Sequence, residues 1–282
     1  MSVRRILGFP VVRMALGIVA AVVLILPALF LTAGTSPTSG RGVVAELYTG
    51  AAVAVALWLL GHFIERRSPG EVGLRPAGIW EVALGFAIGA AVAGAAVGFL
   101  ALTGSYSVTG WGDLHNSLAN LLLLLGFELG SAALQAILFY GIVFRILLEW
   151  LGSWPAIALS VVLFGLLNLT AAHATLFGAI VVGLSGGALL AVSYIATRAV
   201  WLPLGILWGL NFLFAEVLGA IPSSHHRLLQ ARLSGNDFLT GGAAGAESGA
   251  GTLVAASVAV AAVLFWVRSS VWRRNQALWP QS

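Results

Sequence analysis

The chain has 282 residues, of which 60% are hydrophobic and 9% are charged, whereas about 25% of residues are charged in soluble domains. Its net charge of +4 comes from 14 arginines and no lysine, set against 10 acidic residues. No basic domain stands outside the apolar segments, so a nucleic-acid partner is not expected. The absence of cysteine excludes disulfides and thiolate metal sites.

Apolar runs long enough to cross a bilayer, about 20 residues each, recur along the whole sequence. They predict an all-α, polytopic membrane helical bundle of about eight transmembrane helices, with the lipid bilayer as a partner. The predicted spans cover residues 11–33, 43–64, 79–102, 117–150, 155–169, 176–196, 204–220 and 252–267.

The N-terminal membrane region, residues 1–116, contains three of these spans. The first follows a short basic arm; because its apolar run is longer than that of a signal peptide and no A-x-A cleavage site follows, we expect a retained span. The third is rich in Gly and Ala, which predicts close approach to another helix. The next span, 117–150, exceeds the length needed to cross, so we expect it to be tilted, kinked near Gly126 or Gly130, or extended into the cytoplasm.

Residues 117–220 form a second region of four spans. Residues 221–251 are predicted to be an extracytoplasmic loop rich in Gly, Ala and Ser, whose GGAAGAESGAG tract is typical of a flexible linker. Residues 252–282 hold the last span and a basic cytoplasmic tail. With a cytoplasmic N-terminus, eleven arginines fall at the inner face and three outside, which favours a plasma-membrane protein with both termini in the cytoplasm.

Ionisable groups within apolar spans are costly, so Glu128, His173 and Glu216 are candidates for a displaced polar site. Glu128 lies seven residues before Gln135 on the same predicted helix face. A protonated Glu128 bonded to a neighbouring helix would explain it without function. His173 is placed in a short interfacial loop and Glu216 near the outer end of its span. The adjacent pair His225 and His226 is expected in an exposed loop.

Three pairs of residues share helix faces at a spacing of four. They are Ala136 with Tyr140, Phe164 with Asn168, and Leu207 with Asn211. Gln135, Tyr140, Asn168 and Asn211 can therefore converge between helices. A hydrogen-bonded cluster that only fixes helix packing would have the same pattern.

The run SAALQAILFYGIVFRILLEWLGSWPAIALSVVLFGLLNL, with the later run LSGGALLAVSYIATRAVWLPLGILWGLNFL, resembles the core of the CPBP intramembrane metalloproteases. This family includes the type II CAAX prenyl endopeptidases and bacteriocin self-immunity proteins. The resemblance covers residues 118–220. It lies in framework positions, namely Phe139, Gly141, Phe144, Arg145, Trp154, Pro155, Ala156, Phe164, Gly165, Gly187, Thr197, Trp201, Pro203 and Asn211.

The resemblance also indicates which positions would carry the family's chemistry. The Glu-Glu pair and the Arg of the first motif fall on Gln135, Ala136 and Tyr140. The His of the FxxxH motif falls on Asn168. In the HxxxN motif the His falls on Leu207, while the Asn is kept as Asn211. Arg145 is expected to anchor the helix at the cytoplasmic face.

Both acids and both imidazoles of the resembled site are therefore replaced, which removes the general base and the metal ligands together. We expect a non-catalytic homologue, a pseudoprotease, with no cofactor. Its cavity would bind a peptide, a lipid or prenyl chain, or the helix of a partner membrane protein. One alternative is an active endopeptidase that uses the displaced residues, and only then would zinc or another divalent metal be needed. A small membrane transporter component is a further alternative.

Overall fold

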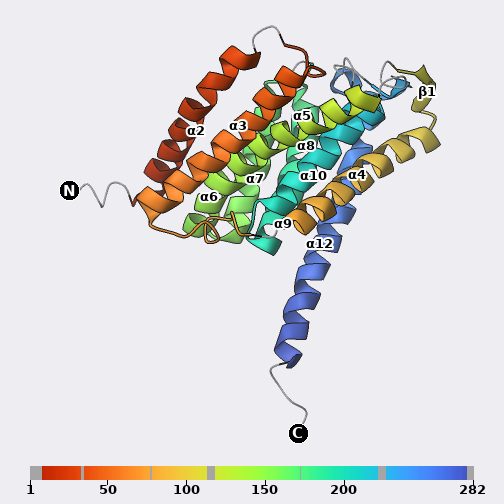
Figure 1. The fold of residues 1–282 in the computed structure, drawn as a ribbon. Coiled ribbons are helices and arrows are strands. Elements are labelled where there is room, and N and C mark those ends of the chain that lie inside the picture. The colour runs from red at the N-terminus through yellow and green to blue at the C-terminus, as the bar shows by residue number, and fades with distance from the viewer. Residues whose placement is uncertain are drawn as a thin grey trace.

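A computed structural model describes residues 8–32, 35–76, 78–112, 118–171, 173–221 and 227–277. The chain folds into a bundle of helices with a two-stranded sheet at one end (Figure 1). Five of the described helices are apolar and long enough to cross a membrane, and three shorter ones are also apolar. The predicted helical membrane bundle is confirmed to this extent, and the number of eight spans stays a prediction.

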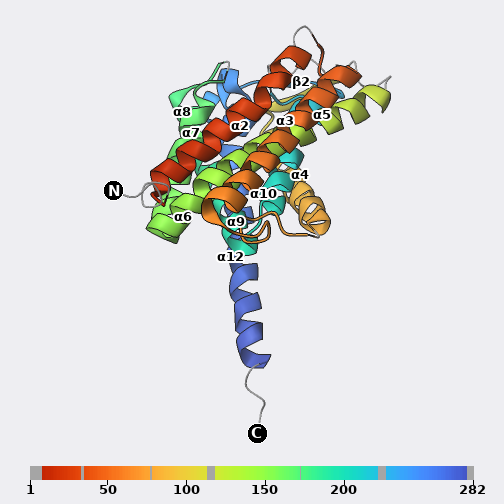
Figure 2. The same cartoon turned by 60° about the vertical axis from the view of Figure 1, so that its left-hand side comes forward.

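The helices follow the predicted spans closely, but four of them contain π-helical segments. Their bounds are α2 (Pro10–Thr32), α3 (Gly40–Leu59) with η1 (Leu60–Glu65), α4 (Ile79–Leu102), α5 (Leu118–Ala136) with η3 (Ile137–Phe144) and α6 (Arg145–Leu151), α7 (Ser153–Asn168), α8 (Leu176–Val182) with η4 (Gly183–Gly187) and α9 (Ala188–Thr197), α10 (Trp201–Asn211) with η5 (Phe212–Val217), and α12 (Ala250–Ala277). In both ribbon views α2 lies along α3, and α12 extends beyond the rest of the bundle (Figures 1 and 2).

The long fourth span departs from α-helical geometry at η3, and not near Gly126 or Gly130. A Cβ at Gly130 would lie 2.4 Å from the backbone carbonyl carbon of Glu46, so this glycine allows α5 to pack closely against α3. A π segment inside an α-helix is rare and is frequent at functional sites.

The prediction that glycines in the third span allow close helix packing is confirmed. A Cβ at Gly85 would lie 2.5 Å from the Leu202 carbonyl oxygen, and one at Gly89 would lie 2.2 Å from that of Ile206. The contact is reciprocal, because Cβ atoms at Gly205 and Gly209 would lie 2.2 and 2.3 Å from carbonyl oxygens of α4. The α4–α10 pair therefore joins two helices through small residues spaced by four.

The described part of residues 221–251 is folded, so the prediction of a flexible linker is wrong there. It contains β2 (Leu229–Leu233), α11 (Asp237–Thr240) and two 3₁₀ turns, η6 (Gly242–Ala244) and η7 (Ala246–Ser248). Strand β2 pairs antiparallel with β1 (Tyr106–Trp111), which precedes α5. The predicted pair His225 and His226 lies outside the described residues.

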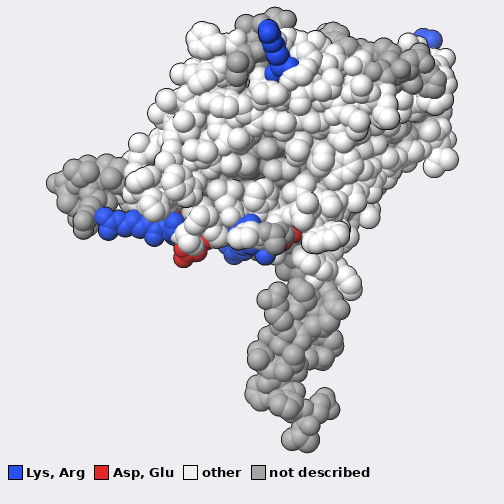
Figure 3. Space-filling view, in the orientation of Figure 1, with Lys and Arg blue, Asp and Glu red and all other residues white. Residues whose placement is uncertain are grey.

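One end of the bundle carries a cluster of charged side chains that we call the ion network: Arg13, Glu65, Arg67, Arg145 and Glu149. Figure 3 shows basic and acidic groups together along one edge of the molecule, and most of the remaining visible surface is uncharged. The network joins the start of α2 to the ends of η1 and α6, so these three ends lie on one side.

Arg145 lies inside this network, and only 3% of its side chain is exposed. Its guanidinium donates two hydrogen bonds to Glu65, of 2.8 and 3.0 Å, and one of 2.9 Å to the Gly141 carbonyl. Glu65 is 2% exposed. A buried guanidinium requires such a paired carboxylate, which the sequence places 80 residues away.

Candidate functional site

A small cavity of about 130 Å³ lies between α5, α7, α10 and the N-terminal part of α12. Three neutral amide side chains line it: Gln135, Asn168 and Asn211. Leu207 and Phe164 also face it. Four of the six positions selected by the motif comparison are thus brought together, although they are up to 76 residues apart (211 − 135 = 76).

Helical geometry explains how these side chains reach one place. Phe164 and Asn168 are four residues apart on α7, as are Leu207 and Asn211 on α10, so each pair shares a helix face. Gln135 donates a hydrogen bond of 3.2 Å from its Nε2 to the Ser131 hydroxyl on the preceding turn of α5.

Three π segments border the cavity. Gln135 comes two residues before η3, and Asn211 directly precedes η5, while Ser185 of η4 contributes to the lining. A π turn widens the helix and changes the direction of the residues beside it. Amphipathic periodicity gives no signal for such a turn, so the sequence did not predict it.

The cavity also contains a carboxylate that sequence reasoning missed. This residue is Glu247 of η7, which lies in the cavity wall. The turn is held from both sides: the Ala246 amide donates to the Ala220 carbonyl at 3.0 Å, and the Thr252 hydroxyl donates to the Ala246 carbonyl at 2.7 Å. The Gly-rich composition of this stretch indicated a flexible linker. The available sign of a functional residue was Glu247 itself, the only acid in the tract GGAAGAESGAG.

Burial raises the pKa of the Glu247 carboxyl from 4.5 to about 7, because the low-polarity surroundings disfavour its charged form. The folded state therefore holds the proton more tightly than the unfolded chain does. Glu247 contributes stability that is fully present below the unfolded pKa and is lost as pH rises to the folded value. Asp237, on α11, is a further acid of the same segment.

We expect the thermal unfolding temperature of the purified protein to fall as the pH rises from about 5 to about 7, and Glu247→Gln to reduce that dependence. Differential scanning fluorimetry in detergent at constant ionic strength measures both slopes. Asp237→Asn, which changes an acid next to the same turn, is the control. Equal slopes in the wild type and Glu247→Gln would contradict the assignment.

Two of the motif positions lie outside the cavity wall. Ala136 is fully buried in the core. Tyr140 is also fully buried, and its hydroxyl donates to the Gly187 carbonyl at 3.5 Å, which Ser160 also approaches at 3.2 Å. Tyr140 therefore joins η3 to η4 as a packing contact.

The three candidates for a displaced site are not brought together. Glu128 lies on α5 next to Asn211, and it is not among the residues that line the cavity. Glu216 is buried in η5, and its backbone carbonyl accepts a hydrogen bond of 2.6 Å from Leu228. His173 is exposed in a turn with φ +62°.

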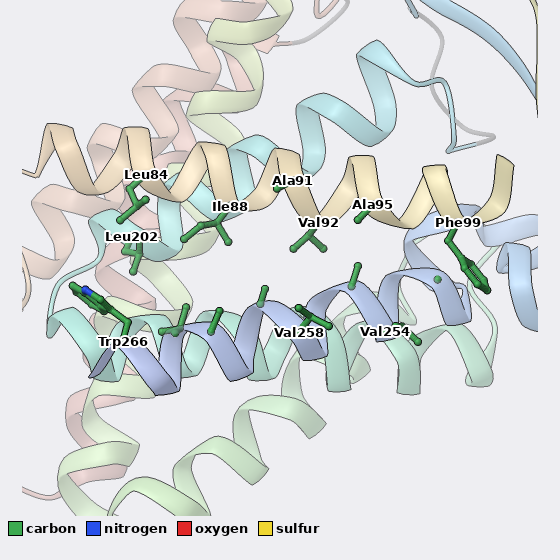
Figure 4. Close-up of a pocket in the computed structure, with 15 residues that line it drawn as sticks. Leu84, Ile88, Ala91, Val92, Ala95, Phe99, Leu202, Val254, Val258 and Trp266 are labelled. Carbon is green, nitrogen blue, oxygen red and sulfur yellow. The ribbon is translucent and has the colours of Figure 1, made fainter. Parts of the chain in front are cut away.

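A second and larger space, of about 690 Å³, lies between α4 and α12 and is apolar. Ile88 and Phe99 of α4 point toward α12, and Trp266 lies at one end (Figure 4). Its α4 lining runs from Leu84 to Phe99, about 22 Å at the helical rise per residue. We call this space the α4–α12 groove. Val92 lines both the groove and the polar cavity.

The residues of the polar cavity do not fit the metal that the resemblance implies. A catalytic zinc site uses three ligands drawn mainly from His, Cys, Asp and Glu, and this lining offers one carboxylate with three amides. In the described part of the chain, no three His, Cys, Asp or Glu side chains are grouped as metal ligands would be. The arrangement can bind through hydrogen bonds and one negative charge.

Comparison of the chain with protein families, with curated proteins and with solved structures finds no match in any of the three.

Proposed function

We propose that this membrane protein is a non-catalytic homologue of the CPBP intramembrane metalloproteases, a pseudoprotease whose cavity binds a ligand without cleaving it. One observation carries the proposal. Gln135, Asn168, Leu207 and Asn211, which occupy motif positions of the resembled family, line one cavity. A shared cavity is the arrangement that a common active site would leave after its reactive groups were replaced.

The replacements remove the chemistry of hydrolysis. A neutral amide at Gln135 cannot accept a proton near neutral pH, and general-base catalysis is typically worth about 10²–10⁴-fold. Asn168 and Leu207 provide no imidazole for a metal, which would otherwise generate the attacking hydroxide. Among the described residues of the cavity wall, Glu247 alone supplies a charge, and none of them is an oppositely charged partner for it.

The ligand class follows from the two neighbouring spaces. The polar cavity suits a hydrogen-bonding group, such as part of a peptide, and the α4–α12 groove suits a lipid or prenyl chain or the helix of a membrane partner. The protein belongs, in this proposal, to the plasma membrane with both termini in the cytoplasm. The ion network supports that orientation, because arginines gather where α2 starts and α6 ends.

An active endopeptidase and a small transporter component are the competing functions. The first requires a base, for which Glu247 in the cavity wall and Glu128 on α5 are the candidates. The second requires flux of a substrate in proteoliposomes. Neither has a matching set of residues in the cavity, so binding without turnover is the function that the geometry supports best.

We expect the purified wild-type protein to bind no stoichiometric zinc and to show no chelator-sensitive cleavage of membrane peptides. The combined variant Gln135→Glu, Asn168→His and Leu207→His should gain about one zinc per chain, since two His and one Glu form a known catalytic zinc set. Metal content after dialysis and isothermal titration measure the gain. The experiment asks directly whether these three positions converge.

Gln135→Glu alone is the matched control, because a single carboxylate does not hold zinc tightly. A folded triple variant that binds no more zinc than this control would contradict the common site. Chelator-sensitive cleavage by the wild type, abolished by Glu128→Gln or Glu247→Gln, would replace the pseudoprotease with the active enzyme.

A further inference from the structure

The Glu247 carboxylate lacks a compensating partner among the described residues. Within the described ranges, no hydrogen bond or ion pair joins it to another residue. It lies in the wall of a cavity whose other polar groups are neutral. A charge removed from water is costly unless an opposite charge or hydrogen-bond donors compensate it. The cavity therefore favours a ligand that carries a positive charge and hydrogen-bond donors.

The amides of the cavity offer acceptors. Gln135 uses one N–H of its Nε2 to donate to the Ser131 hydroxyl. Within the described ranges, its carbonyl oxygen and that of Asn211 take part in no side-chain hydrogen bond, so both can accept from a donor. In the described part of the chain, the side chain of Asn168 makes no hydrogen bond. Amide oxygens together with one carboxylate match a group that has several N–H donors and one positive charge.

A primary ammonium group has these properties: three donors, no acceptor and a compact charge. The volume of about 130 Å³ equals roughly that of four water molecules in the liquid, which is enough for an ammonium group and a short stem. The chain cannot supply the group from a side chain, because it contains no lysine. The arginines of the ion network are held by Glu65 and Glu149.

We propose that the polar cavity binds a primary ammonium group, with Glu247 as its counter-ion and the amide oxygens of Gln135, Asn168 and Asn211 as its acceptors. This inference rests on the proposed function, since it names the ligand chemistry of the same cavity. The source is either a soluble amine or the headgroup of an aminophospholipid whose chain lies in the α4–α12 groove.

Binding of n-butylammonium chloride to the full-length protein in a zwitterionic detergent tests the proposal. Thermal shift titrations at constant ionic strength should show saturable stabilisation. Tetramethylammonium, which lacks N–H donors, and sodium should give a much smaller effect. Glu247→Gln should weaken butylammonium binding about tenfold or more, because a buried charge pair loses one partner. Glu71→Gln, which changes an exposed acid in the 66–76 loop, should leave binding unchanged.

Asn168→Leu, which keeps Glu247, provides a second variant and should also weaken binding. Nanodiscs distinguish the sources. If phosphatidylethanolamine stabilises the wild type more than phosphatidylcholine does, and Glu247→Gln removes the difference, the ammonium group belongs to a lipid. A shift with butylammonium alone assigns it to a soluble amine.

The proposal is overturned if butylammonium gives no saturable shift, if sodium is equally effective, or if Glu247→Gln binds as the wild type does. In those cases the non-catalytic function still stands, provided that the wild type shows no metal-dependent cleavage. Cleavage would overturn the proposed function without bearing on whether the cavity binds ammonium.

Discussion

Arg145→Ala is expected to lower the free energy of unfolding by about 3–5 kcal/mol, because it removes one of the two arginines that compensate the buried Glu65 carboxylate. The side chains of both residues are almost fully buried, and two hydrogen bonds join them. Arg13 also donates to Glu65, at 2.9 Å, so part of the charge stays compensated. Unfolding in mixed detergent micelles, followed by circular dichroism, measures the loss.

Arg67→Ala is the matched control. Arg67 pairs with Glu149 in the same network, but 36% of its side chain is exposed, and exposed pairs contribute about 0–1 kcal/mol. The double variant Arg145→Met with Glu65→Met should recover much of the stability, because replacing both members by apolar groups leaves no unpaired charge. Equal losses for Arg145→Ala and Arg67→Ala would show that burial does not determine the importance of these charges.

Gly205→Ala is expected to destabilise the protein by about 1–3 kcal/mol through overpacking of the α4–α10 contact. The new Cβ would lie 2.2 Å from the Val82 carbonyl oxygen, and that atom belongs to the backbone of α4. A backbone atom cannot rotate away as a side chain can, so the two helices must separate. The loss of unfolding free energy in detergent, together with reduced yield of folded protein, is the measurement.

The partner helix α4 offers two control glycines, at which Ala should raise the free energy of unfolding instead of lowering it. Gly94 and Gly98 of α4 are exposed, and a Cβ at either position would meet nothing within 4 Å. Changing either to Ala should stabilise the protein by about 0.4–1 kcal/mol, because the unfolded chain loses conformational freedom. If Gly205→Ala behaves like Gly94→Ala, the α4–α10 contact is not as close as described.

The helical part of the fold could be predicted from the sequence because it depends on local composition. Apolar runs of sufficient length give helices in a membrane, and Gly85 and Gly89 indicated the close contact of α4. The pairing of β1 with β2 could not be predicted. Tyr106 opposes Leu233 across 127 positions of sequence (233 − 106 = 127). Strand β1 does not alternate, and β2, although it alternates, has only five residues.

The cavity was predictable in part for a similar reason. The spacing of Asn168 and Asn211 within their helices allowed these side chains to converge, and the structure places them in one cavity wall. The roles of Glu247 and Glu65 could not be predicted, because the residues that surround each of them come from distant parts of the sequence. Glu65 follows an apolar span and precedes two arginines, so its composition is typical of an exposed loop. Its burial depends on Arg145.

The π segment η3 has a consequence for how this chain can vary. Gln135 and Arg145 belong to one continuous helix, yet the first faces the polar cavity and the second faces the ion network. The wide turn between them fixes their angular phase. Deleting one residue within Ile137–Phe144 would change this phase and turn Arg145 away from Glu65, unless η3 returned to α-helical geometry. The number of residues in this stretch is therefore under stricter constraint than their identity, and an insertion or deletion here is more damaging than an exchange of one apolar side chain for another.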